Sequence, residues 1–326
     1  MDAAGKEEYK IAREKGDVDQ DGVAHITVFL DGGWSKRSYG HNYNAASGVA
    51  VIIGKSTGKV LYVGVRNKYC CCCARAENKN ETVKEHTCFK NWTGSSGSME
   101  QDIIVEGFNI SEEMHHLRYK RFIADGDATV HANIQKRVSY GSEAINHKFC
   151  HFKVTKIECT NHCIKNYGKN LHKMKTDIKG VPLSIRKLLT KDVIKCLTDT
   201  AQKAIYANAH GDVAQLKDDL RNSIFHVFGN HQKCTVHMCD KVGDVANDRT
   251  AVLTETGANH HLYAAIHNVL LKANMLIDNE TNNRAELFMS ILARFNMGKR
   301  LNLIQRDSFQ IRSYLTGLRY NQGEEW

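Results

Sequence analysis

The sequence predicts an α/β fold in which helices flank a mixed five-stranded sheet. Strand-like runs of apolar and β-branched residues alternate with stretches rich in Gly, Ser and Thr, which suit chain reversals. A run with helical spacing of apolar side chains follows the first three strands and precedes the last two. This order of elements, a meander followed by a helix and further strands, is expected of a sheet that contains both parallel and antiparallel strand pairs. The predicted strands are residues 25–30, 47–53, 59–65, 120–124 and 154–159, and the predicted helix is residues 98–117.

The predicted elements divide the chain into four parts. Residues 1–22 are polar, include a helix-like stretch and are interpreted as a leader, and residues 23–162 form the first part of the core. Residues 163–275 are mostly helix-like and rich in Lys, which indicates an insertion. Residues 276–326 add a last amphipathic helix and a basic tail. We therefore expect a largely helical insertion to interrupt the core before its last helix.

Length and composition indicate a globular protein. The chain has 326 residues, of which 42% are hydrophobic, and this is enough for a packed core. Its apolar runs are far shorter than the roughly 18 residues that a membrane span needs, so we expect no membrane partner. The charged start of the sequence lacks the apolar centre of a secretory signal. A formal net charge of +9 favours an anionic partner such as nucleic acid.

A Cys/His group in the loop of residues 68–92 suggests a zinc site. The chain has 11 cysteines and no secretory signal, which indicates a reducing compartment where thiols bind metals more often than they form disulfides. A Cys-x-x-Cys pair followed by His-x-Cys supplies the four nitrogen and sulfur ligands that tetrahedral zinc prefers. The alternative is a group of reduced free thiols. The expected ligands are Cys70, Cys73, His86 and Cys88.

A second Cys/His group lies within the predicted insertion, at residues 226–239. Its spacing is less regular, and His237 can replace one member. Zinc at either group would stabilise a loop that is too poor in apolar residues to pack by itself. The alternative is a set of histidines on the polar side of a helix. The expected ligands are His226, His231, Cys234 and Cys239.

Three acidic residues stand where catalytic carboxylates are expected. Asp31 ends the first strand-like run, Asp125 ends the fourth, and Glu286 opens the last amphipathic stretch. Two divalent ions about 3.5 to 4 Å apart, held by such acids, can activate a water or hydroxyl for in-line attack on a phosphodiester. Magnesium needs only a few carboxylates beside substrate oxygens, so three acids suffice if the fold gathers them. The alternative is that the aspartates cap turns and the glutamate lies in a solvated first helical turn.

An acidic run near the N-terminus begins like a calcium-binding loop. Asp17, Asp19 and Asp21 have the spacing of its first ligands. Val28 stands at the twelfth position, where a bidentate acid belongs. We therefore expect no calcium site in this segment.

Several segments of the chain resemble the Mutator-like element transposase domain, in its invertebrate form. The likeness runs from about residue 15 to the C-terminus. It implies a ribonuclease H-like core with an Asp-Asp-Glu metal triad, which cleaves DNA at transposon ends and joins the freed 3′-hydroxyl to a target strand. The segments are DGGWSKRSYGHNYN at residues 31–44, CFKNW at 88–92, GSS at 94–96, DGD at 125–127, CTNH at 159–162 and HVFG at 226–229.

The resemblance implies roles for individual residues. Asp31, Asp125 and Glu286 are the expected catalytic acids, and we expect Mg²⁺ or Mn²⁺ at a two-metal site between them. Asp127 competes for the second position, but Asp125 directly ends a strand, and a rigid strand end positions a ligand better than the following turn. The resemblance also implies terminal-repeat and target DNA as partners, a homodimer, and the nucleus as the compartment.

Two further features belong to the expected site. Cys159 and His162 match a Cys-x-x-His signature that such transposases carry between the second and third acids, to which we assign a structural or DNA-end role without metal. The alternative is a buried cysteine beside a histidine whose hydrogen bonds are satisfied. In the C-terminal tail, cationic side chains alternate with groups able to pack, which is typical of a surface that follows a phosphate backbone or of a solvated helix face. The expected DNA-binding cations are Lys299, Arg300, Arg306 and Arg312.

The chain departs from the family pattern at a few positions. Ala124 stands where Gly is expected before the second acid, Ser139 stands where Pro is usual, and Cys71 and Cys72 make the cysteine run dense. None of these changes removes an acid. They are compatible with a rival interpretation, a domesticated and inactive DNA-binding or regulatory protein stabilised by zinc. Because the sequence shows no DNA-binding module before the core, we expect a catalytic fragment.

Overall fold

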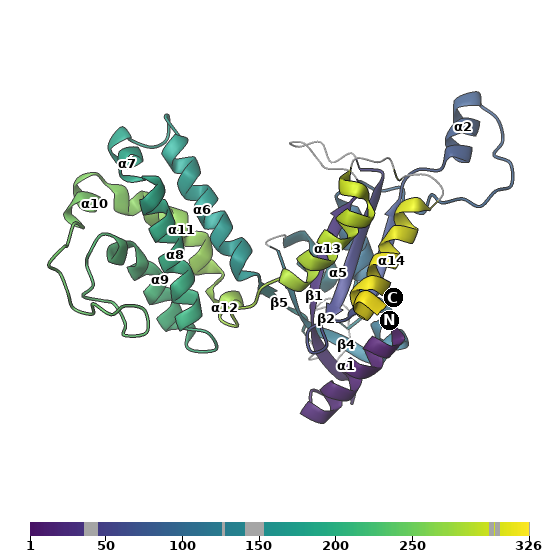
Figure 1. Cartoon of the computed structure of the whole chain (residues 1–326), viewed down its shortest axis with the longest axis horizontal. Coiled ribbons are helices and arrows are strands. Elements are labelled where there is room, and N and C mark those ends of the chain that lie inside the picture. The colour runs from purple at the N-terminus through teal and green to yellow at the C-terminus, as the bar shows by residue number, and fades with distance from the viewer. Residues whose placement is uncertain (36–44, 126–127, 141–152, 300–302, 304–306, 326) are drawn as a thin grey trace. The chain divides into compact units, whose positions relative to one another are not determined.

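The chain folds into two compact units in a computed structural model (Figure 1). Unit 1 comprises Met1–Lys156 and Asn282–Trp326, and unit 2 comprises Ile157–Thr281. Unit 1 is therefore formed from two stretches that unit 2 separates in the sequence. The structure describes residues 1–35, 45–125, 128–140, 153–299, 303 and 307–325.

A mixed five-stranded sheet, in the order β3-β2-β1-β4-β5, is the centre of the α/β fold. β2 pairs antiparallel with both β1 and β3, whereas β4 pairs parallel with β1. The predicted strands correspond to the observed ones, with ends that differ by a few residues. The strands are β1 (Ala24–Trp34), β2 (Ser47–Gly54), β3 (Val60–Asn67), β4 (Leu117–Ala124) and β5 (Thr155–Glu158).

Helices cover both faces of this sheet. All of β2 is buried, which matches its Val- and Ile-rich sequence, because a strand covered on both faces need not alternate apolar with polar residues. α3 and α5 share a core with one face, and α13 and α14 contact the other. The helices of unit 1 are α1 (Asp2–Lys15), α2 (Cys71–Lys79), α3 (Ser98–Asn109), α4 (Ser111–His115), α5 (Ala128–Arg137), α13 (Asn283–Phe295) and α14 (Ser308–Gln322), with short 3₁₀ turns η1 (Met297–Lys299) and η2 (Gly323–Glu325).

The N-terminal segment, expected to be a polar leader, is part of unit 1. α1 has a narrow stripe of small residues, of which Ala4 and Ala12 belong to the same hydrophobic core as α3. Glu8 is fully buried on the same helix, where its Oε1 accepts hydrogen bonds from the backbone N–H and the hydroxyl of Thr57 at 2.7 and 2.9 Å. The polar composition of this segment thus conceals a helix that packs on the core.

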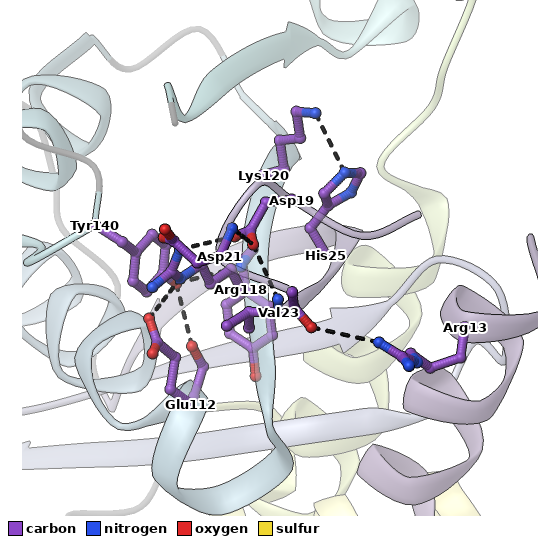
Figure 2. A network of polar contacts seen from close by, with 12 residues as sticks. Arg13, Asp19, Asp21, Val23, His25, Glu112, Arg118, Lys120 and Tyr140 are labelled. Atoms are coloured by element: carbon purple, nitrogen blue, oxygen red, sulfur yellow. Dashed lines mark hydrogen bonds and ion pairs between the residues drawn. The ribbon is translucent and has the colours of Figure 1, made fainter. Parts of the chain in front are cut away.

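Arg118 on β4 connects the turn before β1 to α4 (Figure 2). Its Nη1 donates to Asp19 Oδ2 at 2.7 Å and to Asp21 Oδ2 at 2.5 Å. Its Nε donates to Glu112 Oε1 at 2.7 Å. Asp19 Oδ1 also accepts the backbone N–H of Asp21 and of Val23, which closes the turn. Two aspartates of the run that begins like a calcium loop therefore accept hydrogen bonds from Arg118, and one of them also closes the turn before β1.

Unit 2 is a helical bundle with its own hydrophobic core. Leu197, Leu220 and Ile266, from three different helices, are completely buried in it. Thr190 and Asp212 cap two of the helices by accepting backbone N–H groups of their first turns. None of the helices in the described ranges of either unit is long and apolar enough to span a membrane. The helices are α6 (Thr160–Thr176), α7 (Leu183–Leu188), α8 (Lys191–Ala207), α9 (Val213–Val227), α10 (Ala251–Glu255), α11 (Ala258–Leu271) and α12 (Ala273–Leu276).

The boundaries of unit 2 bear on the domain prediction. The expected insertion, residues 163–275, lies inside unit 2, which begins at Ile157 and ends at Thr281. The difference arises because β5 leads directly into α6, and because the chain returns to the sheet only at Asn282. The core that carries the candidate acids is consequently completed by the last 45 residues of the chain, Asn282–Trp326.

Candidate functional site

Asp31 lies inside β1 and not at its end. The sequence pattern predicts that the strand stops at this aspartate, and that prediction is wrong, because β1 continues through Gly32 and Gly33 to Trp34. The extension exists because β2 pairs with β1 as far as Trp34. Asp31 itself pairs with Val51 of β2, and this strand pairing fixes its position better than a loop would.

The parallel register of β1 and β4 sets Asp125 beside Asp31. Phe29 pairs with Ile123, and each aspartate lies two residues further along the chain. Because side chains alternate between the faces of a sheet, the two aspartates share the face of Phe29 and Ile123. Asp125 follows Ala124, the last residue of β4, as the sequence predicts.

α13 brings Glu286 to the same face. Asn282, the residue before this helix, donates from Nδ2 to the carbonyl oxygen of Leu30 at 2.9 Å. The backbone N–H of Glu286 then donates to the carbonyl oxygen of Asn282 at 3.1 Å. Further along the helix, Met289 Sδ lies 3.0 Å from where a Cβ on Gly33 would stand, so helix and strand approach closely. The first turn of α13 is thereby anchored one residue before Asp31.

α3 supplies a fourth carboxylate, Glu100, that the sequence analysis missed. Glu100 lies in the first turn of this helix. Its carboxyl carbon lies 2.3 Å from where a Cβ on Gly32 would stand, so the glycine leaves the space that this carboxyl group occupies. Two sequence signals could have found it: an acid at the start of the helix after the third strand, and a glycine directly after Asp31.

The pKa of Asp31 reports the electrostatics of this cluster. Burial raises the pKa well above its usual value, and the negative charges of Glu100 and Asp125 raise it further. Glu286 also raises it, whereas the backbone N–H of Gly32, which donates to Asp31 Oδ1 at 2.8 Å, lowers it. All four carboxylates belong to unit 1. The structure therefore brings together the three predicted acids and adds one.

The carboxylates are spaced more widely than the ligands of a single ion. Among the described residues, the groups of three or more His, Cys, Asp and Glu whose ligand atoms all lie within 4.8 Å of one another are the two Cys/His clusters, and the acids do not form such a group. A two-metal site spreads its ligands over two ions about 3.5 to 4 Å apart, so its acids need not all meet around one point.

The first predicted zinc group forms a compact cluster at the start of α2. Cys70, Cys73, His86 and Cys88 place their ligand atoms within 4.8 Å of one another and can hold a metal ion. His86 Nε2 lies 3.2 Å from Cys70 Sγ and 3.5 Å from Cys73 Sγ. On the other side of the ring, His86 Nδ1 lies 2.8 Å from the carbonyl oxygen of Lys84. A proton on Nδ1 would leave Nε2 to face the thiols, which is the orientation of a histidine ligand.

The second predicted group also assembles, at the end of α9. His226, His231, Cys234 and Cys239 have their ligand atoms within 4.8 Å of one another. His226 Nδ1 lies 3.4 Å from Cys234 Sγ, and His231 Nδ1 lies 3.3 Å from Cys239 Sγ. Asn222 Nδ2 donates to Cys234 Sγ at 3.4 Å, a contact that steadies the thiol. The alternative ligand His237 does not belong to the group. Each unit thus holds one Cys/His cluster.

The Cys-x-x-His pair lies at the start of α6 in unit 2. Cys159 precedes the helix and is completely buried. His162 Nδ1 lies 3.3 Å from Cys159 Sγ. The two side chains thus contact each other, and their structural or DNA-end role stays a prediction.

The comparison with known families identifies the chain. The family model of Mutator-like transposases matches residues 1–239, well over half of the chain. The chain belongs to this family. The resemblance predicted from the sequence is therefore confirmed, while the invertebrate subtype stays a prediction. No curated protein and no solved structure gives a match.

Of the four acids of this Mutator-like transposase, three lie within the residues that the family model matches and one lies outside them. The matched residues 1–239 include Asp31, Glu100 and Asp125, and they also include both Cys/His clusters. Glu286 lies beyond them. The assignment of Glu286 as the third acid therefore rests on the position of α13 and on the effect of the Glu286 charge on the pKa of Asp31.

The predicted DNA-binding tail of this Mutator-like transposase is only partly within the described residues. Arg312 Nη1 donates to the carbonyl oxygen of Phe295, and its Nε donates to Ser308 Oγ at 3.4 Å. Its guanidinium thus contacts the end of α13, and a DNA-binding role for it stays a prediction. Lys299 ends η1, and its side chain is outside the described part. Asp127, Arg300 and Arg306 lie outside the described residues.

Proposed function

We propose that this chain is the catalytic core of an Asp-Asp-Glu transposase with a ribonuclease H-like fold. It would cleave DNA strands at transposon ends and transfer them to target DNA. The observation that carries the proposal is the convergence of Asp125 and Glu286 on Asp31, from a neighbouring strand and from a helix, within one compact unit of a Mutator-like transposase. The sheet order and the mixed strand directions support the fold assignment.

The chemistry of the donor set fits magnesium or manganese. Four carboxylates offer hard oxygen ligands, the type that these cations prefer. Burial, together with the charges of Glu100, Asp125 and Glu286, raises the pKa of Asp31, and a divalent cation would relieve this repulsion between carboxylates. When bound, two such ions supply an activated water or hydroxyl and stabilise the leaving oxygen.

Separate residues of the chain would hold and orient this site. Asp31 and Asp125 would provide the carboxylates of the rigid sheet, and Glu286 that of the helix crossing it. Glu100 would add charge beside Asp31 and help to orient the ions. Gly32 leaves room for the Glu100 carboxyl group, and Asn282 fixes the start of α13.

We propose zinc as the ion of both Cys/His clusters. Each cluster provides four nitrogen and sulfur ligands and leaves no open position, which is typical of structural zinc. The ions would hold the loop after α2 and the segment after α9, both of which bury few apolar side chains. Terminal-repeat and target DNA as substrates, action as a homodimer and location in the nucleus are parts of the same proposal.

A strand-cleavage assay tests the proposed function. The full chain, loaded with zinc, is incubated with duplex DNA that carries the terminal repeats flanking its own coding sequence. Nicking is expected with added magnesium or manganese and is expected to stop in Asp31→Asn, Asp125→Asn and Glu286→Gln. Glu113→Gln, which changes an exposed glutamate of α4, is the matched control and should nick like the wild type.

Two outcomes would contradict the proposal. Equal nicking by wild type and Asp31→Asn would mean that the cleavage comes from elsewhere. Salt-sensitive DNA binding without any metal-dependent cleavage would favour the rival, a domesticated protein that keeps the fold and has lost turnover, because phosphate contacts weaken steeply with ionic strength.

A further inference from the structure

A pocket of about 370 Å³ lies beside the paired strands β1 and β4, away from the carboxylates. Three cationic side chains line it, from Lys120, Arg121 and Lys153, together with His25. Among the described residues of the lining, Asp17 is the acidic one, so the described cations outnumber the described anions by three to one. All lining residues belong to unit 1. We call this cavity the β-bulge pocket.

A β-bulge explains how two consecutive cations reach one pocket. Ile26 of β1 pairs with Tyr119 of β4, but the next residue, Thr27, pairs with Arg121, so Lys120 is an extra residue in β4. In a regular strand, neighbouring side chains point to opposite faces, and one of the two cations would enter the core. Because of the bulge, Lys120 and Arg121 both line the pocket, while Tyr119 remains completely buried.

Two residues of the β-bulge pocket, Thr27 and Arg121, lie on the sheet face that carries Asp31 and Asp125. The core on the α3 side of the sheet includes Ile26, Val28 and Leu30 of β1. The alternate residues Thr27 and Asp31 therefore share the opposite face. Thr27 and Arg121 each stand four residues before their aspartate, Asp31 and Asp125. At about 3.3 Å per strand residue, the pocket is roughly 13 Å from the carboxylate pair, a span of a few nucleotides.

The charges in the β-bulge pocket suit an anion. Lys120 Nζ lies 3.2 Å from His25 Nε2 (Figure 2). Burial lowers the pKa of His25, and the nearby Lys120 charge lowers it further, so the imidazole is neutral near pH 7 and can accept a hydrogen bond from the ammonium group. The lysine side chain is thereby oriented. Lys and Arg donors in a concave site on this face match the oxygens of a phosphodiester.

We propose that the β-bulge pocket binds a backbone phosphate of the DNA strand that runs along the sheet from Asp31 and Asp125. The proposal rests on the proposed nuclease function for the path of the strand. The pocket contacts the DNA backbone and not the bases. It would hold the strand so that the scissile phosphate stays beside the carboxylates.

Salt-dependent DNA binding tests the pocket independently of cleavage. Affinities of the full, zinc-loaded Asp31→Asn chain for labelled duplex DNA are measured by fluorescence anisotropy over a range of KCl concentrations. Lys120→Gln and Arg121→Gln, added to this background, are each expected to reduce the slope of log K against log[salt] by about 0.9 for one lost phosphate contact. Lys120→Arg keeps the charge and should keep the slope. Lys10→Gln, which removes an exposed cation of α1, is the matched control and should also keep it.

A neutral backbone substitution locates the contact. Single methylphosphonates are placed one at a time along either strand, and binding is compared between the Asp31→Asn chain and its Arg121→Gln derivative. We expect one position, a few nucleotides from the cleavage site, where the neutral linkage weakens binding of the parent but not of the derivative, since the partner cation is already gone.

The outcomes separate this inference from the proposed function. If Lys120→Gln and Arg121→Gln keep the parental slope, or reduce it no more than Lys10→Gln does, the pocket is not a phosphate site, even if the wild type nicks DNA. If the slopes fall as expected while the wild type never nicks, the phosphate site stands and the nuclease proposal fails. Thermal melting of each variant shows whether it is folded. For the assignment to hold, Lys120→Arg must keep the parental slope.

Discussion

Asn282 donates a hydrogen bond from Nδ2 to the carbonyl oxygen of Leu30 across 2.9 Å, which joins two residues 252 positions apart in the sequence. Asn282 is completely buried and directly precedes α13. Leu30 directly precedes Asp31. This side-chain contact therefore joins the start of the helix that carries Glu286 to the strand that carries Asp31.

Asn282→Ala tests this contact. The variant leaves a buried carbonyl without this donor, which costs about 1–3 kcal/mol of the free energy of unfolding. Because the helix start is also released, metal-dependent nicking is expected to fall by more than the loss of folded protein explains. Denaturant unfolding and nicking rates measured on the same preparation check this, and a loss of stability with unchanged nicking would show that Glu286 is positioned by other contacts.

Asp31→Asn is expected to stabilise the protein in buffer without added magnesium or manganese. Burial, with the charges of Glu100 and Asp125, raises the folded-state pKa of Asp31 above its unfolded value. The contribution of a raised acid is complete below the unfolded value of about 3.9 and is lost as the pH rises through the folded pKa. An asparagine has no such dependence. Melting temperatures from about pH 4 to pH 8 should show the variant gaining on the wild type as pH rises, and a constant difference would contradict the explanation.

Glu100→Gln is expected to weaken the metal site while the fold is kept. The variant removes a charge beside Asp31 but retains the shape of the side chain against Gly32. By analogy with groups that orient metal ligands, we expect a loss of about 10- to 100-fold in metal affinity or nicking. Magnesium titration of the nicking rate measures it, with Glu113→Gln as control. Wild-type titration curves for Glu100→Gln would remove this residue from the site.

The two Cys/His clusters are expected to hold two zinc ions per chain, one each. Cys73→Ser and Cys234→Ser should each lose one ion, whereas Cys72→Ser and Cys196→Ser, which change exposed thiols outside the clusters, should lose none. Native mass spectrometry counts the ions. Chelation should make the cluster loops accessible to protease before the sheet unfolds, and an unchanged cleavage pattern would argue against a structural role for the ions.

Arg118→Gln is expected to destabilise unit 1. The arginine is largely buried and makes ion pairs with Asp19, Asp21 and Glu112. Because two of these three partners are partly exposed and screened by solvent, we estimate a loss of about 2–3 kcal/mol, below that of a fully buried pair. Lys195→Gln removes an exposed ion pair of α8 and should leave unfolding unchanged. Similar unfolding curves for both variants would show that the Arg118 network is of little consequence.

The sequence predicted those parts of the fold that depend on local pattern. The strands were predictable because Val, Ile and other strand formers are bounded by turn residues, and the Cys/His groups because their ligands are close in sequence. The extension of β1 through Gly32 and Gly33 was not, since glycine disfavours strands and the extension depends on pairing with β2. The bulge at Lys120 likewise arises from the register between two strands.

The candidate site was predictable to the extent that an acid follows or begins an element. Asp125 and Glu286 met this condition. Glu100 did as well, but nothing in the sequence shows that α3 packs with its first turn against Gly32. The burial of α1 was also missed, because a helix whose buried stripe is made of Ala, Gly and one fully enclosed glutamate has a polar composition. Tertiary contacts decided each of these cases.

The division of unit 1 into two stretches has a consequence for protein synthesis. A ribosome completes the strands with Asp31 and Asp125, and then all of unit 2, before it reaches Asn282. A growing polypeptide therefore contains the residues of all five strands and of both Cys/His clusters while Glu286 is still untranslated. If cleavage needs Glu286, translation itself delays nuclease activity until the ribosome has passed the whole of unit 2.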